Sequence, residues 1–181
     1  QLAELLKTVD LFVFDTETDS LDTYNVNLAG VSFCYKEKEA WFVATDPNKE
    51  DAGLFSNSTS DRLPTADFVE IFKELFEDEN IKKVCQNAKF DIAVLAHYGI
   101  EVKGFYFDTM LASYIIDPDQ KHNMDDLSKT YLNYSPIPLS DLLGRKKNAD
   151  MIFDVDKVLL SNYSCEDADI TFRLYTILKS L

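Results

Sequence analysis

Short apolar runs alternate with amphipathic stretches along this chain, and the alternation predicts an α/β domain. Strand-like runs cover residues 11–14, 28–35, 40–45, 82–86 and 102–107. Residues 65–79 carry apolar side chains with the spacing of an amphipathic helix, at Phe68, Ile71, Phe72, Leu75 and Phe76. Further helices are expected over residues 88–98, 109–116, 124–131 and 155–181, and a break near Asn162 stays open in the last of them.

The connections between these runs predict how the strands pair. The charged residues 36–39 resemble a hairpin connector, so the first three strands should be antiparallel. The later strands alternate with helices, which is how parallel neighbours are joined. We therefore expect a central mixed five-stranded sheet flanked by helices. We expect residues 46–64 to form a loop and residues 135–147 to be irregular.

The length of 181 residues fits one domain, and no apolar stretch is long enough to span a membrane. The first residues do not form a signal peptide or a membrane anchor. The three cysteines form no CxxC pair, which favours reduced thiols and a cytoplasmic location over a disulfide framework or a zinc site. Because the chain lacks an initiator Met, we expect it to be cut from a larger protein.

The charge balance changes the expected partner. Lys and Arg total 18 against 32 Asp and Glu, which gives a net charge of −14. A protein that binds duplex DNA through its phosphates is expected to be basic. The chain should therefore bind DNA weakly alone, with a neighbouring domain supplying positive surface. The basic run at residues 145–147 either follows a DNA strand or lies in a solvated loop.

Three groups of carboxylates are candidates for chemistry. Asp15 and Glu17 follow an apolar run and share one strand face, where a divalent cation would neutralise them. Asn87, an expected helix cap, precedes Asp91 by one turn. Each pattern alone also fits a solvated strand end or an ordinary helix start.

The third group lies on the late helix, where Tyr163 and Asp167 share one face. The neighbouring Glu166 and Asp169 are expected to point into solvent. A half-buried tyrosine with its hydroxyl in water is the alternative explanation for Tyr163.

In this order the three motifs resemble the DEDD superfamily of 3′–5′ exonucleases, and Tyr163 resembles the tyrosine of its DEDDy branch. Asn162 stands where the histidine branch has its histidine. Residues 14–21, 86–91, 108–114, 124–128 and 163–169 further resemble the proofreading domain of family A bacterial DNA polymerases, the DNA polymerase I type. The resemblance implies a ribonuclease H-like fold and a single 3′–5′ exonuclease domain over residues 1–181.

The resemblance also implies roles for individual residues. Two divalent metal ions, Mg²⁺ (or Mn²⁺ or Zn²⁺), would be held by Asp15, Glu17, Asp91 and Asp167, and Tyr163 would hold the attacking water. The 3′ end of single-stranded or frayed DNA would contact Thr16, Leu21, Asn87, Lys121 and Leu139, and Phe90 and Phe153 are further apolar candidates. The expected partner is a polymerase domain of the same polypeptide, and no membrane is involved.

Two other functions stay open on the sequence alone. A ribonuclease D-type enzyme that trims RNA 3′ ends would carry the same four carboxylates and tyrosine. A catalytically silent domain that only positions a polymerase would not need them. The intact carboxylates favour an enzyme, and residues 18–21 and 124–128 favour the polymerase group.

Overall fold

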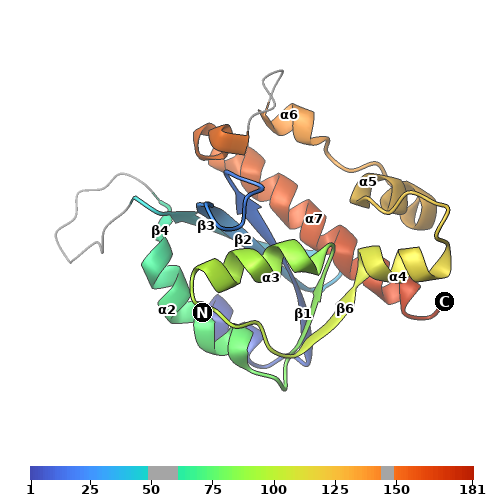
Figure 1. Ribbon diagram of the computed structural model, residues 1–181, viewed down its shortest axis with the longest axis horizontal. Helices are drawn as coiled ribbons and strands as arrows, with labels where there is room; N and C mark the ends of the chain where they lie inside the picture. Colours follow the sequence, from blue (N-terminus) through green and yellow to red (C-terminus); the bar gives the residue numbers. More distant parts are fainter. Residues whose placement is uncertain (49–60, 144–148) are drawn as a thin grey trace.

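The computed structural model describes residues 1–48, 61–143 and 149–181, and shows a mixed sheet with helices on both faces (Figure 1). The described strands are β1 (Leu11–Thr18), β2 (Leu28–Lys36), β3 (Glu39–Asp46), β4 (Leu63–Pro64), β5 (Lys82–Cys85) and β6 (Phe105–Asp108). They lie in the order β4-β3-β2-β1-β5-β6. β1, β2 and β3 are antiparallel, while β5 pairs parallel with both β1 and β6. The predicted hairpin and helical crossover are confirmed.

The helices alternate with the later strands as the periodicity predicts. They are α1 (Leu2–Leu6), α2 (Thr65–Glu77), α3 (Ala88–His97), α4 (Thr109–Ile116), α5 (Met124–Leu127), α6 (Leu139–Leu143) and α7 (Lys157–Leu178). A π-helical turn, Ser128–Leu132, follows α5, and a 3₁₀ helix, Ala149–Asp154, precedes α7. None of the helices in the described parts combines the length and apolar character that crossing a membrane requires.

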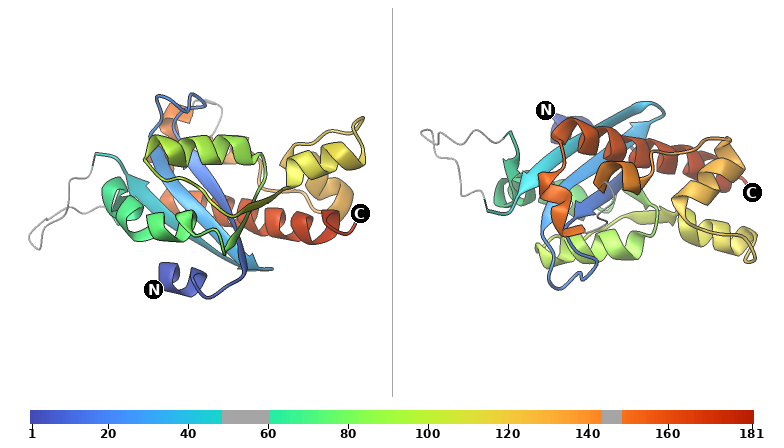
Figure 2. Two further views of the ribbon diagram at one scale, coloured as in Figure 1. Left: turned by 60° about the horizontal axis from the view of Figure 1, so that its bottom comes forward. Right: turned by 90° about the horizontal axis from the view of Figure 1, so that it is seen from above.

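The two faces of the sheet are covered by different helices, as Figure 2 shows from above. Phe12 and Phe14 of β1 point to one face, where aromatic residues of α2, including Phe76, pack on them. Val13 points to the opposite face and belongs to the cluster containing Ala168 of α7. Side chains alternate between the two faces along a strand. Asp15 and Glu17 therefore lie on the same face as Val13, which is the face that α7 covers.

Two predictions about elements are wrong, and the structure also decides one open question and adds one helix. The described sheet has six strands, because Leu63 and Pro64 at the end of the expected loop pair with β3. α7 continues unbroken through Asn162, which lies on its exposed side. α1 was not expected, and α6 lies inside the segment that was expected to be irregular.

Asp108, at the end of β6, caps two helices with one carboxylate. It accepts hydrogen bonds from the backbone N–H groups of Met110 and Leu111 at 2.8 and 3.2 Å, which caps α4. It also accepts from the N–H groups of Asn87 and Ala88 at 3.2 and 2.8 Å. Asn87 itself has φ 63° and makes no side-chain cap bond, so its predicted capping role is wrong and Asp108 supplies the acceptor for α3 instead.

Candidate active site

Three carboxylates meet where the second half of β1 faces α7. Asp15 and Glu17 lie two residues apart on β1 and so share a face, and Asp167 comes from α7 packed on that face. One oxygen from each carboxylate lies within 4.8 Å of the others. Asp167 and Glu17 are only 8% and 9% exposed. Next to these carboxylates, Val13 of β1 and Ala168 of α7 belong to one apolar cluster, which packs α7 onto β1.

Asp91 approaches the same group from α3, on the other side of β1. Its Oδ1 accepts hydrogen bonds from the backbone N–H of Thr16 at 3.0 Å and from the Thr16 hydroxyl at 2.6 Å. Asp91 is 2% exposed, and after burial its charge is the largest influence that raises the pKa of Asp15. The Thr16 side chain lies on the opposite face of β1 from Asp15 and Glu17, which is the face that α3 covers. Its two hydrogen bonds therefore attach Asp91 to the same strand that carries Asp15 and Glu17.

α7 supplies two further polar groups to the site. Tyr163 lies one turn before Asp167, and the two side chains are hydrogen-bonded. The Ser164 hydroxyl donates to Glu17 Oε1 at 2.7 Å. Ser164 was missed on the sequence, although a small polar residue three positions before Asp167 on the same helical face was an available signal.

Burial of several carboxyl groups together strongly favours their protonated forms. It raises the pKa of Glu17 to about 7 and that of Asp91 to about 7. Burial raises the pKa of Asp15 and Asp167 well above the usual range, with further contributions from neighbouring carboxylates. Among the ion pairs in the described parts of the chain, none involves these four residues.

This donor set fits a hard divalent cation. Carboxylate oxygens are the ligands that Mg²⁺ and Mn²⁺ prefer, and a cation would supply the positive charge that the described side chains do not. The free energy cost of ionising four buried acids would then be offset by the bound charge.

The whole chain, residues 1–181, matches the model of the 3′-5′ exonuclease family. The chain belongs to that family. Among curated proteins, DNA polymerase I of Rhizobium leguminosarum is 38% identical over 96% of this chain and 18% of its own length. DNA polymerase I of Borreliella burgdorferi is 35% identical over 97% of this chain and 18% of its own length. The exonuclease domain thus spans about a fifth of these relatives, and it is a domain of the kind found in DNA polymerase I.

Solved structures resemble the exonuclease domain in fold. A Brucella melitensis NrnC structure with bound Mg²⁺ matches with a TM-score of 0.70 at 20% identity, over 96% of this chain and 73% of that one. A Trypanosoma brucei RNase D complex with RNA U12 matches with a TM-score of 0.71 at 15% identity, over 98% of this chain and 58% of that one. The expected ribonuclease H-like fold is confirmed, with six strands in the described sheet instead of five.

The residues predicted to contact substrate lie in different settings in the exonuclease domain. Leu21 is 84% exposed, Leu139 is 48% exposed, and Asn87 lies exposed at the start of α3. The Lys121 ammonium is solvent-exposed and lies 3.8 Å from Asp126 Oδ2. Thr16 is buried and holds Asp91, so its side chain has a structural partner already.

Two further apolar candidates are engaged in packing. Phe90 packs against the large core cluster between the sheet and α3. Phe153 packs against the cluster containing Leu160, and the guanidinium of Arg62 lies 5.6 Å from the centre of its ring. The basic run at residues 145–147 lies outside the described residues.

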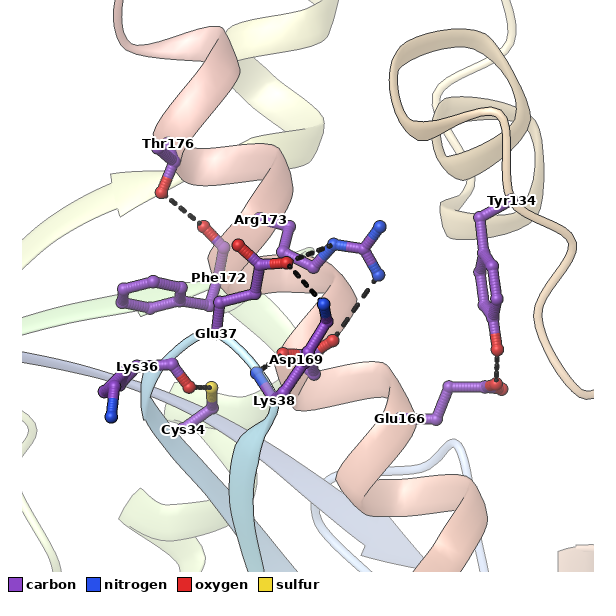
Figure 3. A network of polar contacts seen from close by, with 10 residues as sticks. All are labelled: Cys34, Lys36, Glu37, Lys38, Tyr134, Glu166, Asp169, Phe172, Arg173 and Thr176. Carbon is purple, nitrogen blue, oxygen red and sulfur yellow. Dashed lines mark hydrogen bonds and ion pairs between the residues drawn. The ribbon is translucent and has the colours of Figure 1, made fainter.

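The prediction that Glu166 and Asp169 point into solvent is wrong (Figure 3). Glu166 accepts hydrogen bonds from the Tyr134 hydroxyl and from a backbone N–H in the segment before α6. Asp169 accepts from the backbone N–H of Lys38 in the β2–β3 turn and lies 3.5 Å from the Arg173 guanidinium. Both carboxylates therefore attach neighbouring segments to α7.

Proposed function

We propose that this chain is the proofreading 3′–5′ exonuclease domain, residues 1–181, of a longer bacterial, cytoplasmic DNA polymerase I. It hydrolyses the last phosphodiester bond at a DNA 3′ end and releases a nucleoside 5′-monophosphate. The observation that carries the proposal is the convergence of three carboxylates that are buried or partly buried, Asp15, Glu17 and Asp167, with Asp91 and Tyr163 beside them.

Two divalent cations, Mg²⁺ or alternatively Mn²⁺ or Zn²⁺, fit this donor set. Asp15, Glu17 and Asp167 would hold one of them, and Asp15 and Asp91 the other. When bound, such ions lower the pKa of water and neutralise charge on the leaving oxygen. The protein contributes the fixed positions of its carboxylates. Ser164 and Thr16 restrict the rotation of Glu17 and Asp91 by donating hydrogen bonds to them.

Tyr163 orients the attacking water and does not remove its proton. Burial and the nearby carboxylates raise the pKa of its hydroxyl above the usual value, so the group remains protonated at neutral pH. A protonated phenol with one hydrogen bond to Asp167 can still accept one from water. The hydroxyl thereby fixes where the water lies relative to the terminal phosphate.

A frayed single strand is the substrate that suits this site. The terminal phosphate must reach buried carboxylates, so the last nucleotides have to leave the duplex stack. Unpairing costs a few kcal/mol per base and least at a mismatch, which would supply selectivity for errors. Exposed Leu21 and Leu139 offer apolar contacts to unstacked bases, and Asn87 and Lys121 offer polar ones.

The net charge of −14 supports a polymerase domain of the same polypeptide as the partner. A domain this acidic attracts few phosphates by itself. A linked basic domain would present the 3′ end at high effective concentration, and the relatives' greater length leaves room for one.

The test is digestion of a 3′-labelled single-stranded oligonucleotide with and without Mg²⁺ or Mn²⁺. We expect stepwise shortening from the 3′ end with 5′-monophosphate products, and none with Asp15→Ala. Matched and mismatched duplex ends are compared in the same assay, and faster removal of the mismatch is expected. Absence of divalent-dependent digestion would instead support a catalytically silent scaffold.

Trimming of RNA 3′ ends is the second candidate, because a Trypanosoma brucei RNase D complex with RNA U12 shares this fold. The two substrates differ at the 2′ position, so a matched DNA and RNA oligonucleotide of one sequence separates the candidates. A clear preference for RNA would replace DNA proofreading as the function.

A further inference from the structure

Residues 133–138, called the strap here, join the π-helical turn to α6 and run alongside α7 (Figure 1). The strap begins at Asn133, which has φ 51°, and contains two prolines. At its start, Leu132 packs against the cluster that includes Ile170 of α7. Beyond its end, Leu142 packs against the cluster that includes Leu160. The strap therefore passes the turns of α7 that carry Tyr163 and Asp167.

Backbone hydrogen bonds hold the strap only near its two ends, within the part of the chain that the structure describes. The N–H of Tyr134 donates to the carbonyl of Ser128 at 3.3 Å, and the N–H of Asp141 donates to the carbonyl of Pro138 at 2.9 Å. Its middle depends on side chains. Prolines at 136 and 138 cannot donate backbone hydrogen bonds there.

Glu166 holds the middle of the strap with both carboxylate oxygens. Oε1 accepts from the Tyr134 hydroxyl at 2.5 Å, and Oε2 accepts from the backbone N–H of Ile137 at 2.6 Å. The guanidinium of Arg173 lies 5.6 Å from the centre of the Tyr134 ring and also pairs with Asp169, which steadies the tyrosine (Figure 3). Hydrogen bonds to an ionised acceptor are the stronger kind, so one residue governs where the strap lies.

We propose that Glu166 is a positioning residue for the nucleic-acid strand, acting by fixing the strap as one wall of the site beside Tyr163 and Asp167. The inference rests on the proposed function. The strap leads directly into Leu139, which is 48% exposed, so its position determines where that apolar contact is offered. Glu166 immediately precedes Asp167. The same turn of α7 therefore fixes the position of the strap and the position of the Asp167 carboxylate.

The charge of Glu166 matters because both of its contacts are hydrogen bonds donated to an ionised acceptor. In Glu166→Gln the amide oxygen can accept from the Ile137 N–H, and the NH₂ group can donate to the Tyr134 hydroxyl. Both contacts are then possible, but each becomes a weaker hydrogen bond between neutral groups, so the strap is held less firmly. Tyr134→Phe removes one donor and leaves the backbone tie intact, so it should have the smaller effect of the two.

The experiment measures kcat and KM on a single-stranded DNA oligonucleotide for this chain, Glu166→Gln and Tyr134→Phe. For Glu166→Gln we expect KM to rise about fivefold and kcat to stay within about twofold, because the strand is misplaced while the carboxylates and Tyr163 stay in position. Amide hydrogen exchange at Ile137 should accelerate in the same variant.

Glu77→Gln is the matched control, because Glu77 of α2 accepts a hydrogen bond from the Glu101 backbone N–H at 3.0 Å in the same way. Glu77 lies outside the described site. Glu77→Gln should therefore change the thermal midpoint by about as much as Glu166→Gln does, while KM stays unchanged. Faster exchange at Ile137 with unchanged KM would overturn the positioning role, and unchanged exchange would overturn the tie itself.

A binding measurement separates this proposal from the proposed function. Fluorescence anisotropy of a labelled single-stranded oligonucleotide, without divalent cations, reports the strap's contribution without any turnover. Weaker binding by Glu166→Gln than by Glu77→Gln supports the strap's role even if no digestion is seen, in which case only the exonuclease proposal falls. Equal binding by the two variants refutes the positioning role.

Discussion

The two faces of β1 carry opposite chemistry in a single eight-residue strand. Phe12 and Phe14 face α2 and α3 in a tightly packed aromatic cluster, and both are fully buried. Asp15 and Glu17 face α7, together with Asp167, in a cluster of like charges. The aromatic face stabilises the fold through burial, while the carboxylate face costs stability and is held in place by its surroundings. One strand can therefore support both because its side chains alternate.

The largest expected effect is on the carboxylate face. Asp15→Asn should lower exonuclease activity by about a thousandfold or more, because Asp15 lies among all the other carboxylates of the site. Its thermal midpoint without divalent cations should not fall, since the substitution removes one of several crowded charges. Single-turnover digestion and a thermal melt of the same preparation measure both. A clear loss of stability would contradict the contrast between the two faces.

The opposite pattern is expected on the aromatic face. Phe76 lies with its ring centre 5.0 Å from that of Phe14 and 5.9 Å from that of Phe12, and is fully buried. Phe76→Ala should lower the free energy of unfolding by about 3–5 kcal/mol, by transfer and cavity costs. Urea unfolding measures the loss. The milder Phe76→Leu serves as the control, and its kcat per folded molecule should stay near that of the parent chain.

The pH dependence of stability should report the carboxylate face. Glu17 and Asp91 have folded-state pKa values of about 7, above those of ordinary carboxyl groups, so the folded state retains protons that the unfolded state releases. Their contribution is fully present below about pH 4 and is lost as pH rises through about 7. In EDTA the thermal midpoint should therefore fall by several degrees from pH 5 to pH 8. Adding about 10 mM Mg²⁺ at pH 8 should restore the thermal midpoint. A midpoint in EDTA that rises with pH would refute the prediction.

A smaller effect is expected where the two faces are linked. Thr16→Val removes the hydroxyl that donates to Asp91 and keeps the backbone donor. We expect kcat to fall about tenfold, because Asp91 gains rotational freedom without losing its position in the fold. Thr16→Ser keeps the hydroxyl and should retain most of the activity. Equal kcat for the two variants would show that the backbone N–H alone fixes Asp91.

The smallest expected effect concerns charge. With a net charge of −14, the chain alone should bind single-stranded DNA weakly, with an affinity that changes little with salt. Fluorescence anisotropy at several salt concentrations measures the slope. A steep decline in affinity with salt would show that many phosphates contact basic side chains of this chain. It would contradict the expectation that a linked polymerase domain supplies the positive surface.

Elements with a clear period could be predicted from the sequence, and elements defined by their partners could not. α2 and β1–β3 follow from apolar spacing and a charged connector. β4 has two residues, too few for any pattern, and exists because β3 offers a free edge. α7 continues through Asn162 because packing of its other face outweighs one residue's modest helix propensity.

The site divides in the same way. Asp15, Glu17, Asp91, Tyr163 and Asp167 lie in motifs whose spacing and resemblance predict them. The hydroxyls of Thr16 and Ser164 were not expected to position carboxylates, because their partners lie 75 and 147 positions away along the chain. The sequence predicts solvent exposure for Glu166 because it lies outside the Tyr163–Asp167 pair, and the pattern does not reveal the strap that covers it.

Asp108 also has a consequence for genetics. Its carboxylate caps α3, which carries Asp91, and α4, which precedes Lys121. A substitution at position 108 removes acceptors from both helix starts at once, although Asp108 belongs to no metal-ligand motif. Among alleles that abolish exonuclease function, changes at this codon should therefore appear beside changes at the carboxylate codons. Their protein would be distinguished by lower abundance in the cell, because the defect is in folding and not in chemistry.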